Sequence, residues 1–425
     1  MKRKKENILR TSLPLFSASV LGQGINFLLF FFLPFLFNAE DIGGFFVFLA
    51  VAQILIPLVS LQSHNAIVLS RSDVVAVSNL VISMGIGALF SFLFFLLTYL
   101  LNLFSCCWSD ESTTWILFLP VYVFSGSVLL SFEQYLTYLG DYRLLGNLRL
   151  LKAAFVMVPI VLGGFIFAGL EVLVLGHFVG QVAGILFVLW VLKLPFAKVI
   201  VSKMVVRLFV LRHRKILTYN TLITGILMLI NHSPALLLSF YFGDRVVALY
   251  GIVQRVFSAI PGALGQSVSQ VFFRKCSHYY NTNKPVYTTA VRTLKQMGGW
   301  YLGYGIISVL VAPIVFYELM EPGWENAAII TKILLPLILI QTLSIPFTTL
   351  FTVFKNQRRV IWFYLGGFFV RIVLGLVVPL GMIGTGYKEG LMIYSATGLV
   401  YYFFYIRELL LQAKRNDTNL KVAIR

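Results

Sequence analysis

The sequence predicts an all-α membrane protein that crosses the bilayer about a dozen times, and two observations carry this prediction. The chain has 425 residues, of which 59% are hydrophobic and only 12% are charged. A soluble domain usually carries about 25% charged residues. Long apolar runs recur along the chain between short polar gaps. Each run must be helical, because lipid offers no hydrogen-bond partners to backbone groups.

Twelve apolar runs approach the length of about 20 residues that one crossing requires. The first follows a basic N-terminus and is too long for a signal-peptide core, which favours a permanent span. The predicted spans cover residues 13–37, 43–62, 78–104, 115–138, 151–168, 172–193, 216–242, 246–273, 296–319, 328–354, 360–382 and 388–406.

The gaps between the spans alternate in charge. The gaps after the odd-numbered spans contain several acidic residues and one cation, Arg245, whereas the other gaps and the termini hold nearly all remaining Lys and Arg. The positive-inside rule places the basic side in the cytoplasm, so an even number of spans puts both termini there. The net charge of +18 therefore suits a membrane surface, and we expect no nucleic-acid partner.

Two halves are visible in the sequence. Residues 37–57 can be laid on 241–261 without gaps, which pairs Phe37 with Tyr241 and Pro57 with Pro261. Duplication of a six-helix unit explains this match, and chance similarity between apolar segments is the alternative. The predicted parts are an N-terminal lobe (1–193), a basic cytoplasmic linker (194–215), a C-terminal lobe (216–406) and a cytoplasmic tail (407–425). The linker is either a helix on the membrane surface or a plain basic loop.

Two arginines lie deep in predicted spans. Arg255 and Arg371 sit at depths of ~14 and ~16 Å, close to the middle of a ~30 Å hydrocarbon core. A charge inside a span costs roughly 2.5–3.5 kcal/mol, so both side chains should face either the protein interior or a central cavity between the two lobes, and we favour the cavity. Few acidic residues lie at this depth to form an ion pair, which favours an anionic ligand bound by guanidinium groups.

Polar stripes on other spans suggest that the cavity is hydrated. Gln23, Asn26, Asn231 and Gln266 join the two arginines as candidate substrate-binding residues. Small and polar residues can instead hold helices together, and that alternative stays open.

Glu133 and His64 are candidates for ion coupling, although both lie near span ends, where a structural role is the alternative. The sequence has no Walker A loop, no HExxH motif and no paired-cysteine metal site. We therefore expect no enzymatic activity, no catalytic residue, no cofactor and no metal site.

Three groups of short motifs resemble the polysaccharide transporter family, the Wzx-type flippases of the multidrug/oligosaccharidyl-lipid/polysaccharide exporter superfamily. They are Ala66-Ile67-Val68-Leu69 followed by Asp73, then Asp141-Tyr142-Arg143, and finally Leu249-Tyr250-Gly251 with Arg255, Ile260-Pro261 and Ser269-Gln270-Val271. One segment departs from the family. Many relatives carry a basic-aromatic-acidic triplet before the first motif, where this chain reads Gln62-Ser63-His64-Asn65.

The resemblance implies a function. The expected substrate is an undecaprenyl-diphosphate-linked oligosaccharide, such as an O-antigen repeat unit, moved across the cell inner membrane by alternating access with cation antiport. Expected partners are this substrate, membrane lipids, a polysaccharide polymerase and a chain-length regulator. A multidrug or small-molecule exporter of the related branch is the alternative, and a polysaccharide polymerase or ligase is a third reading.

Overall fold

The computed structural model describes residues 24–70, 72–104, 110–192, 202–282, 284–320, 323–354 and 357–424, and every regular element in these ranges is a helix. Ten helices in these ranges are long and apolar enough to cross a membrane. The elements are η1 (Leu33–Phe35), α2 (Ala39–Val59), α3 (Asn65–Val68), α4 (Asp73–Phe104), α5 (Asp110–Leu139), α6 (Tyr142–Ile166), α7 (Leu170–Leu192), α8 (Lys203–Lys215), η3 (Ile216–Asn220), α9 (Thr221–Phe242), α10 (Asp244–Asn281), α11 (Tyr287–Pro313), η4 (Ile314–Leu319), α12 (Glu325–Val353), α13 (Gln357–Phe368), η5 (Phe369–Ile383) and α14 (Tyr387–Ile424).

These helices confirm the predicted fold class, an all-α polytopic membrane protein. Of the first predicted span, residues 24–35 form a shorter apolar helix, and residues 13–23 lie outside the described ranges. The last predicted span lies within α14, which continues as helix to Ile424. The hydropathy pattern locates the crossings well because the spanning helices must be apolar, whereas helical extensions into water leave no such signal.

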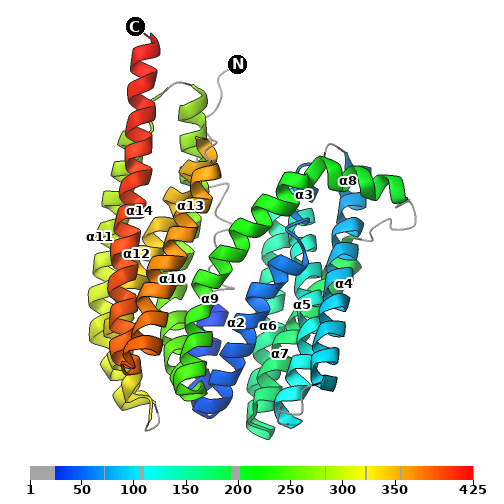
Figure 1. Cartoon of the computed structure of the whole chain (residues 1–425), viewed down its shortest axis with the longest axis vertical. Helices are drawn as coiled ribbons and strands as arrows, with labels where there is room; N and C mark the ends of the chain where they lie inside the picture. The colour runs from blue at the N-terminus through cyan, green and yellow to red at the C-terminus, as the bar shows by residue number, and fades with distance from the viewer. Residues whose placement is uncertain are drawn as a thin grey trace. The chain divides into compact units, whose positions relative to one another are not determined.

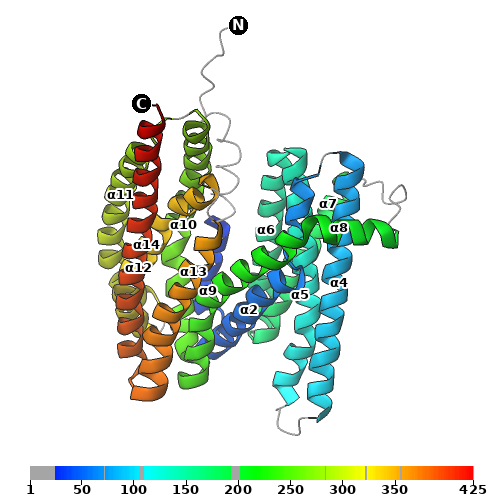
Figure 2. The ribbon, with the colours of Figure 1, turned by 45° about the horizontal axis from the view of Figure 1, so that its top comes forward.

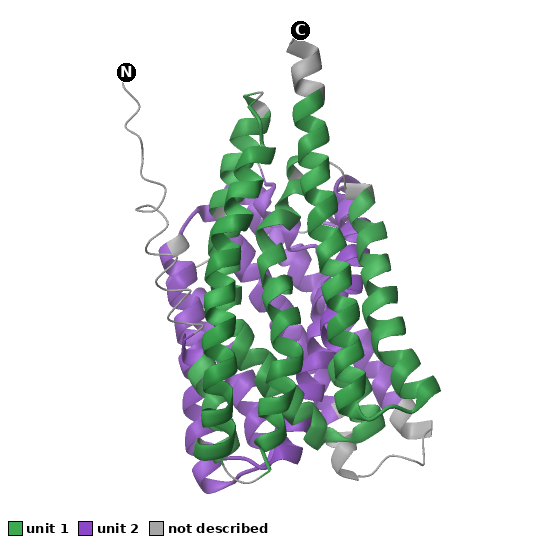
Figure 3. Ribbon diagram, turned by 90° about the vertical axis from the view of Figure 1, so that its left-hand side faces the viewer, with its two compact units in different colours: residues 1–11, 27–35, 233–425 green, residues 12–26, 36–232 purple. Residues whose placement is uncertain are grey.

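The structure contains two compact units, which Figure 3 colours separately. Among the described residues, the N-terminal unit comprises those of 24–26 and 36–232, and the C-terminal unit those of 27–35 and 233–424. The division between them falls inside α9, after His232. Residues 27–35 belong to the C-terminal unit although they precede most of the N-terminal one.

The two segments that the sequence pairs, 37–57 and 241–261, form the same local structure. Each contains a short turn followed by a helix, α2 or α10, with an acidic first turn and a proline inside. At α2 the side chain of Asn38 accepts a hydrogen bond from the Asp41 amide at 2.7 Å, which satisfies one free donor of the helix start. At α10 the turn passes through Gly243 at a φ of +79°, a conformation that favours glycine.

The N-terminal unit packs around an apolar core of α3, α4, α5, α6 and α7. Phe132, Leu136 and Leu148 are completely buried there. Glycines on α7 let α6 approach closely, because a Cβ atom at Gly180 would meet the Val156 side chain and, at 3.0 Å, the Lys152 carbonyl oxygen. Close approach through small residues is a common way for membrane helices to associate.

In the C-terminal unit, side-chain hydrogen bonds compensate for the backbone hydrogen bond that a proline in the middle of α10 removes. Pro261 has no N–H, so the Phe257 carbonyl four residues earlier loses its helical partner. The Tyr304 hydroxyl of α11 donates to this carbonyl at 3.2 Å, and the neighbouring Tyr301 donates to the Pro261 carbonyl at 2.7 Å. Tyrosines of α11 thus replace and supplement backbone hydrogen bonds that lipid could not supply.

Two helical segments, α8 and the C-terminal part of α14, fall in the parts of the sequence that are predicted to be cytoplasmic. In the N-terminal unit, α8 crosses the end of α4 (Figures 1 and 2), and its Phe209 packs against Ala66 and Ile82. On α8, Met204 and Leu208 remain exposed. In the C-terminal unit, the Asp417 carboxylate of α14 accepts from the amides of Val286 and Tyr287, at 3.0 and 2.9 Å, and so caps the start of α11.

Candidate substrate-binding site

Arg371, one of the two arginines that the sequence singles out, is the largest fully buried side chain of the described residues. It lies on η5 and is only 1% exposed. Its guanidinium donates to the hydroxyls of Tyr402, at 3.1 Å, and Tyr394, at 2.5 Å, both from α14. The same guanidinium carbon lies 5.1 and 5.3 Å from the two ring centroids. Hydroxyls and ring faces therefore stabilise this charge inside the membrane.

Two glycines of α13 and η5 make this contact possible. A Cβ at Gly367 would lie 2.6 Å from the ring of Tyr401, and one at Gly375 would lie 2.6 Å from the Thr397 hydroxyl. The absence of side chains at these positions lets α14 approach closely on either side of Arg371. Gly367 and Gly375 thus serve helix packing, and Arg371 lies between them in the chain.

The helix that carries Arg371 changes its winding just before it. Residues 369–383 form a π-helix, in which each turn contains more residues than in an α-helix. The Tyr401 hydroxyl donates to the Phe363 carbonyl, at 3.1 Å, shortly before this change. Wider turns rotate the following side chains around the axis, so the π-helical register helps determine which residues face α14.

Tyr250 of α10 lies within electrostatic range of both arginines. Its buried hydroxyl lies close enough to interact electrostatically with Arg255, Arg371 and Tyr394. Arg255 itself is half-buried, and its guanidinium carbon lies 5.1 Å from the ring centroid of Phe30. Both predicted arginines therefore lie in the C-terminal unit within electrostatic range of Tyr250, and we call Arg255, Arg371, Tyr250, Tyr394 and Tyr402 the arginine–tyrosine cluster.

The tyrosines are the part of the cluster that sequence reasoning misses. They occupy one side of α14, at positions 387, 394, 401, 402 and 405, and Tyr250 lies in a motif noted above only for its family resemblance. Tyrosines spaced by seven residues lie on one face of a helix, and this spacing at 387, 394 and 401 is the sequence pattern that could have identified them as partners of a buried arginine.

The remaining predicted substrate-binding residues are distributed over both units. Gln266 is exposed on α10 of the C-terminal unit. Asn231 is half-buried on α9 and Asn26 is exposed, and both belong to the N-terminal unit. Gln23 lies outside the described residues. The roles of these four residues, and the cavity between the lobes, stay predictions.

The two candidates for ion coupling lie in the N-terminal unit. Glu133 on α5 forms an ion pair with Arg149 of α6, at 3.7 Å. His64 precedes α3, outside the spanning helices, and is only 4% exposed. Its Nδ1 atom has no hydrogen-bond partner among the described residues, and burial lowers the pKa of this imidazole to about 4.

A chain of buried serines begins beside His64. The Ser63 and Ser83 hydroxyls lie 2.8 Å apart, and those of Ser83 and Ser131 lie 3.1 Å apart. The backbone at this end of α2 is unusual, because Leu61 and Gln62 have φ values of 46° and 53°. The segment around Gln62-Ser63-His64-Asn65 is thus a buried, strained turn that is hydrogen-bonded to α4. In the described ranges, no group of three His, Cys, Asp or Glu side chains could hold a metal ion.

Comparison with solved structures shows which known architecture this is. A multidrug resistance MATE family transporter of the MOP superfamily, in its inward-facing conformation, matches with a TM-score of 0.68 and 13% identity, over 98% of this chain and 99% of that one. The chain has the MATE fold. An outward-facing MATE transporter matches with a TM-score of 0.62 and 12% identity, over 96% of both chains. A MATE protein in complex with MaD5 matches with a TM-score of 0.66 and 14% identity, over 97% of this chain and 96% of that one.

Comparison at the level of sequence identifies no relative of this chain. No family model matches the chain, and no curated protein matches it. At 12–14% identity these solved structures show the fold alone, and the resemblance to the exporter superfamily rests on the short motifs. The narrower resemblance to polysaccharide flippases rests on those motifs alone.

Proposed function

We propose that this protein is an alternating-access transporter that moves an undecaprenyl-diphosphate-linked oligosaccharide from the cytoplasmic to the periplasmic leaflet. The MATE fold supports a transporter, because the solved proteins with this fold are described as transporters in inward-facing and outward-facing conformations. The flippase motifs around Ala66, Asp141 and Tyr250 support the lipid-linked cargo.

One observation carries the choice of an anionic cargo. Arg255 is half-buried, well inside the apolar helix α10, and Tyr250 lies within electrostatic range of both Arg255 and the fully buried Arg371. Guanidinium groups keep their charge and bind phosphate oxygens through paired hydrogen bonds. We infer that Arg255 contacts the diphosphate or an acidic sugar, whereas Arg371 adds positive potential from its buried position.

A multidrug exporter is the second candidate, and the solved multidrug MATE transporters favour it. A cationic drug would need an acidic partner within the membrane. Glu133 is an acidic side chain of a described span, but it is already paired with Arg149. The positive charges of the arginine–tyrosine cluster would repel such a drug, which is why we place this function second.

The proposal includes a location, partners and an energy source. The protein resides in the inner membrane with both termini in the cytoplasm, since the basic residues gather on one side of the predicted spans. A polysaccharide polymerase and a chain-length regulator act on its product. Cation antiport drives transport, with Glu133 and His64 as the candidate coupling residues.

The experiment compares arginine variants in a strain that lacks the chromosomal gene. Arg255→Ala should abolish surface polysaccharide and cause lipid-linked repeat units to accumulate on the cytoplasmic face, while Arg255→Lys should retain part of the activity. Arg245→Ala is the matched control, because this arginine lies in the first turn of the same helix. Protein amounts in the membrane are measured for every variant.

Two outcomes would contradict the proposal. Normal surface polysaccharide in a well-expressed Arg255→Ala strain would remove the assigned role of this residue. Loss of drug resistance in the deletion strain, with polysaccharide unchanged, would favour the multidrug exporter.

A further inference from the structure

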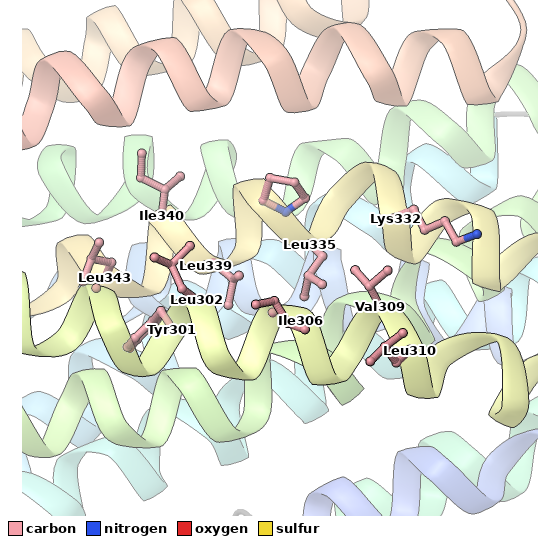
Figure 4. A pocket seen from close by; sticks show the side chains of 13 residues that line it. Tyr301, Leu302, Ile306, Val309, Leu310, Lys332, Leu335, Leu339, Ile340 and Leu343 are labelled. Atoms are coloured by element: carbon pink, nitrogen blue, oxygen red, sulfur yellow. The ribbon is translucent and has the colours of Figure 1, made fainter.

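A long apolar groove runs between α11 and α12 of the C-terminal unit (Figure 4). Its volume is about 700 Å³, within the range of small-molecule sites. The wall on α11 extends from Gly298 to Leu310, and the wall on α12 extends from Lys332 to Leu343. At a rise of 1.5 Å per residue the groove is ~16 Å long, close to the hydrocarbon thickness of one bilayer leaflet.

The walls of the groove suit a hydrocarbon chain. On α11, Leu302, Ile306 and Leu310 are each more than 60% exposed although they belong to a spanning helix. Exposed leucine and isoleucine in the middle of a span indicate contact with lipid. The groove is therefore open to acyl chains and closed to polar solutes along most of its length.

Lys332 is the exception in this apolar lining. It is exposed and lies seven residues after the start of α12, a depth of ~10 Å, where a charge is costly. No carboxylate of the described residues forms an ion pair with it. In Figure 4 its amine points along α12 away from Leu343, toward the beginning of the helix. A lysine side chain in this position can reach the headgroup region while its stem lies along the apolar wall.

We propose that this groove binds one anionic phospholipid, with an acyl chain between α11 and α12 and the phosphate at the Lys332 ammonium. The arrangement matches the lipid in three respects: length of the apolar part, open access from the bilayer, and a cation at one end of the groove. This site is separate from the arginine–tyrosine cluster, and the inference does not depend on the identity of the transported cargo.

Native mass spectrometry of delipidated protein tests the site by titration with phosphatidylglycerol or phosphatidylcholine of identical chains. The wild-type protein should bind one phosphatidylglycerol about fivefold more tightly than phosphatidylcholine, the factor expected for one basic residue at a membrane surface. Lys332→Gln should remove this preference. Lys388→Gln, which changes a lysine in the first turn of α14, should keep it.

A second pair of variants tests the groove itself. Gly298→Phe places a ring at the end of the groove far from Lys332, where a Cβ has no neighbour within 4 Å. This substitution should weaken the binding of both lipids. Gly303→Phe is the control, since this glycine also has open space but does not line the groove. Equal binding of both lipids by the wild type, or identical effects of the two glycine variants, would overturn the proposal. Tighter binding of undecaprenyl phosphate than of phosphatidylglycerol would also overturn it, by assigning the groove to a prenyl lipid.

Discussion

The buried imidazole of His64 makes the turn between α2 and α3 sensitive to acid. Burial lowers the pKa of His64 from its usual 6.5 to about 4 in the folded protein. When the turn opens, the imidazole regains its ordinary pKa and binds a proton below pH 6.5. The opened state therefore binds more protons than the folded state between pH 6.5 and 4, so lowering the pH stabilises the opened state relative to the folded one.

The size of the effect follows from this difference in pKa. The stabilisation of the closed turn by neutral His64 is complete above pH 6.5 and is lost as the pH falls toward 4. One pKa unit corresponds to 1.36 kcal/mol, so the free energy of opening should fall by about 2 kcal/mol between pH 7.5 and pH 5. The strained φ angles of Leu61 and Gln62 already favour opening, because residues other than glycine rarely adopt them.

Hydrogen exchange of peptides covering residues 60–70 measures this opening, after correction for the intrinsic pH dependence of exchange. His64→Gln should remove most of the change in opening free energy between pH 7.5 and pH 5. His278→Gln, which replaces an exposed imidazole near the end of α10, should not. An opening free energy that is the same at both pH values, or a wild-type pH dependence in the His64→Gln protein, would rule out this role of His64.

Three further predictions concern stability. Gly180→Ala should destabilise the protein by about 1–3 kcal/mol, because its Cβ meets α6, whereas Gly85→Ala on α4 has open space and should change little; thermal unfolding in detergent compares them. Arg371→Lys should cost about 1.5–3 kcal/mol through a lost charged hydrogen bond, and the exposed Arg359→Lys should stay near wild type in the same assay. Asp417→Ala removes the cap of α11 and should cost about 1–2 kcal/mol locally, measured as faster exchange of the first amides of that helix.

The candidate site was only partly predictable. Arg255 and Arg371 stand out in the sequence because a charge within an apolar run is costly and rare. The sequence does not show that both lie within electrostatic range of Tyr250, because this depends on the packing of α10, η5 and α14 within one unit. The tyrosines were missed because an aromatic side chain in a span is ordinary, and only its distance from a guanidinium group gives it a role.

The sequence by itself determined the fold class and most of the spanning segments, because lipid requires apolar side chains and internally satisfied backbone groups at every crossing. Only the tertiary structure decided how the polar groups inside those segments are satisfied. Tyr304 can supply the hydrogen bond that Pro261 removes because α11 lies beside α10. Arg371 meets Tyr402, 31 residues later, because the π-helical turns and two glycines bring η5 and α14 together. Hydropathy is a property of each residue, whereas these contacts arise from register and packing between helices.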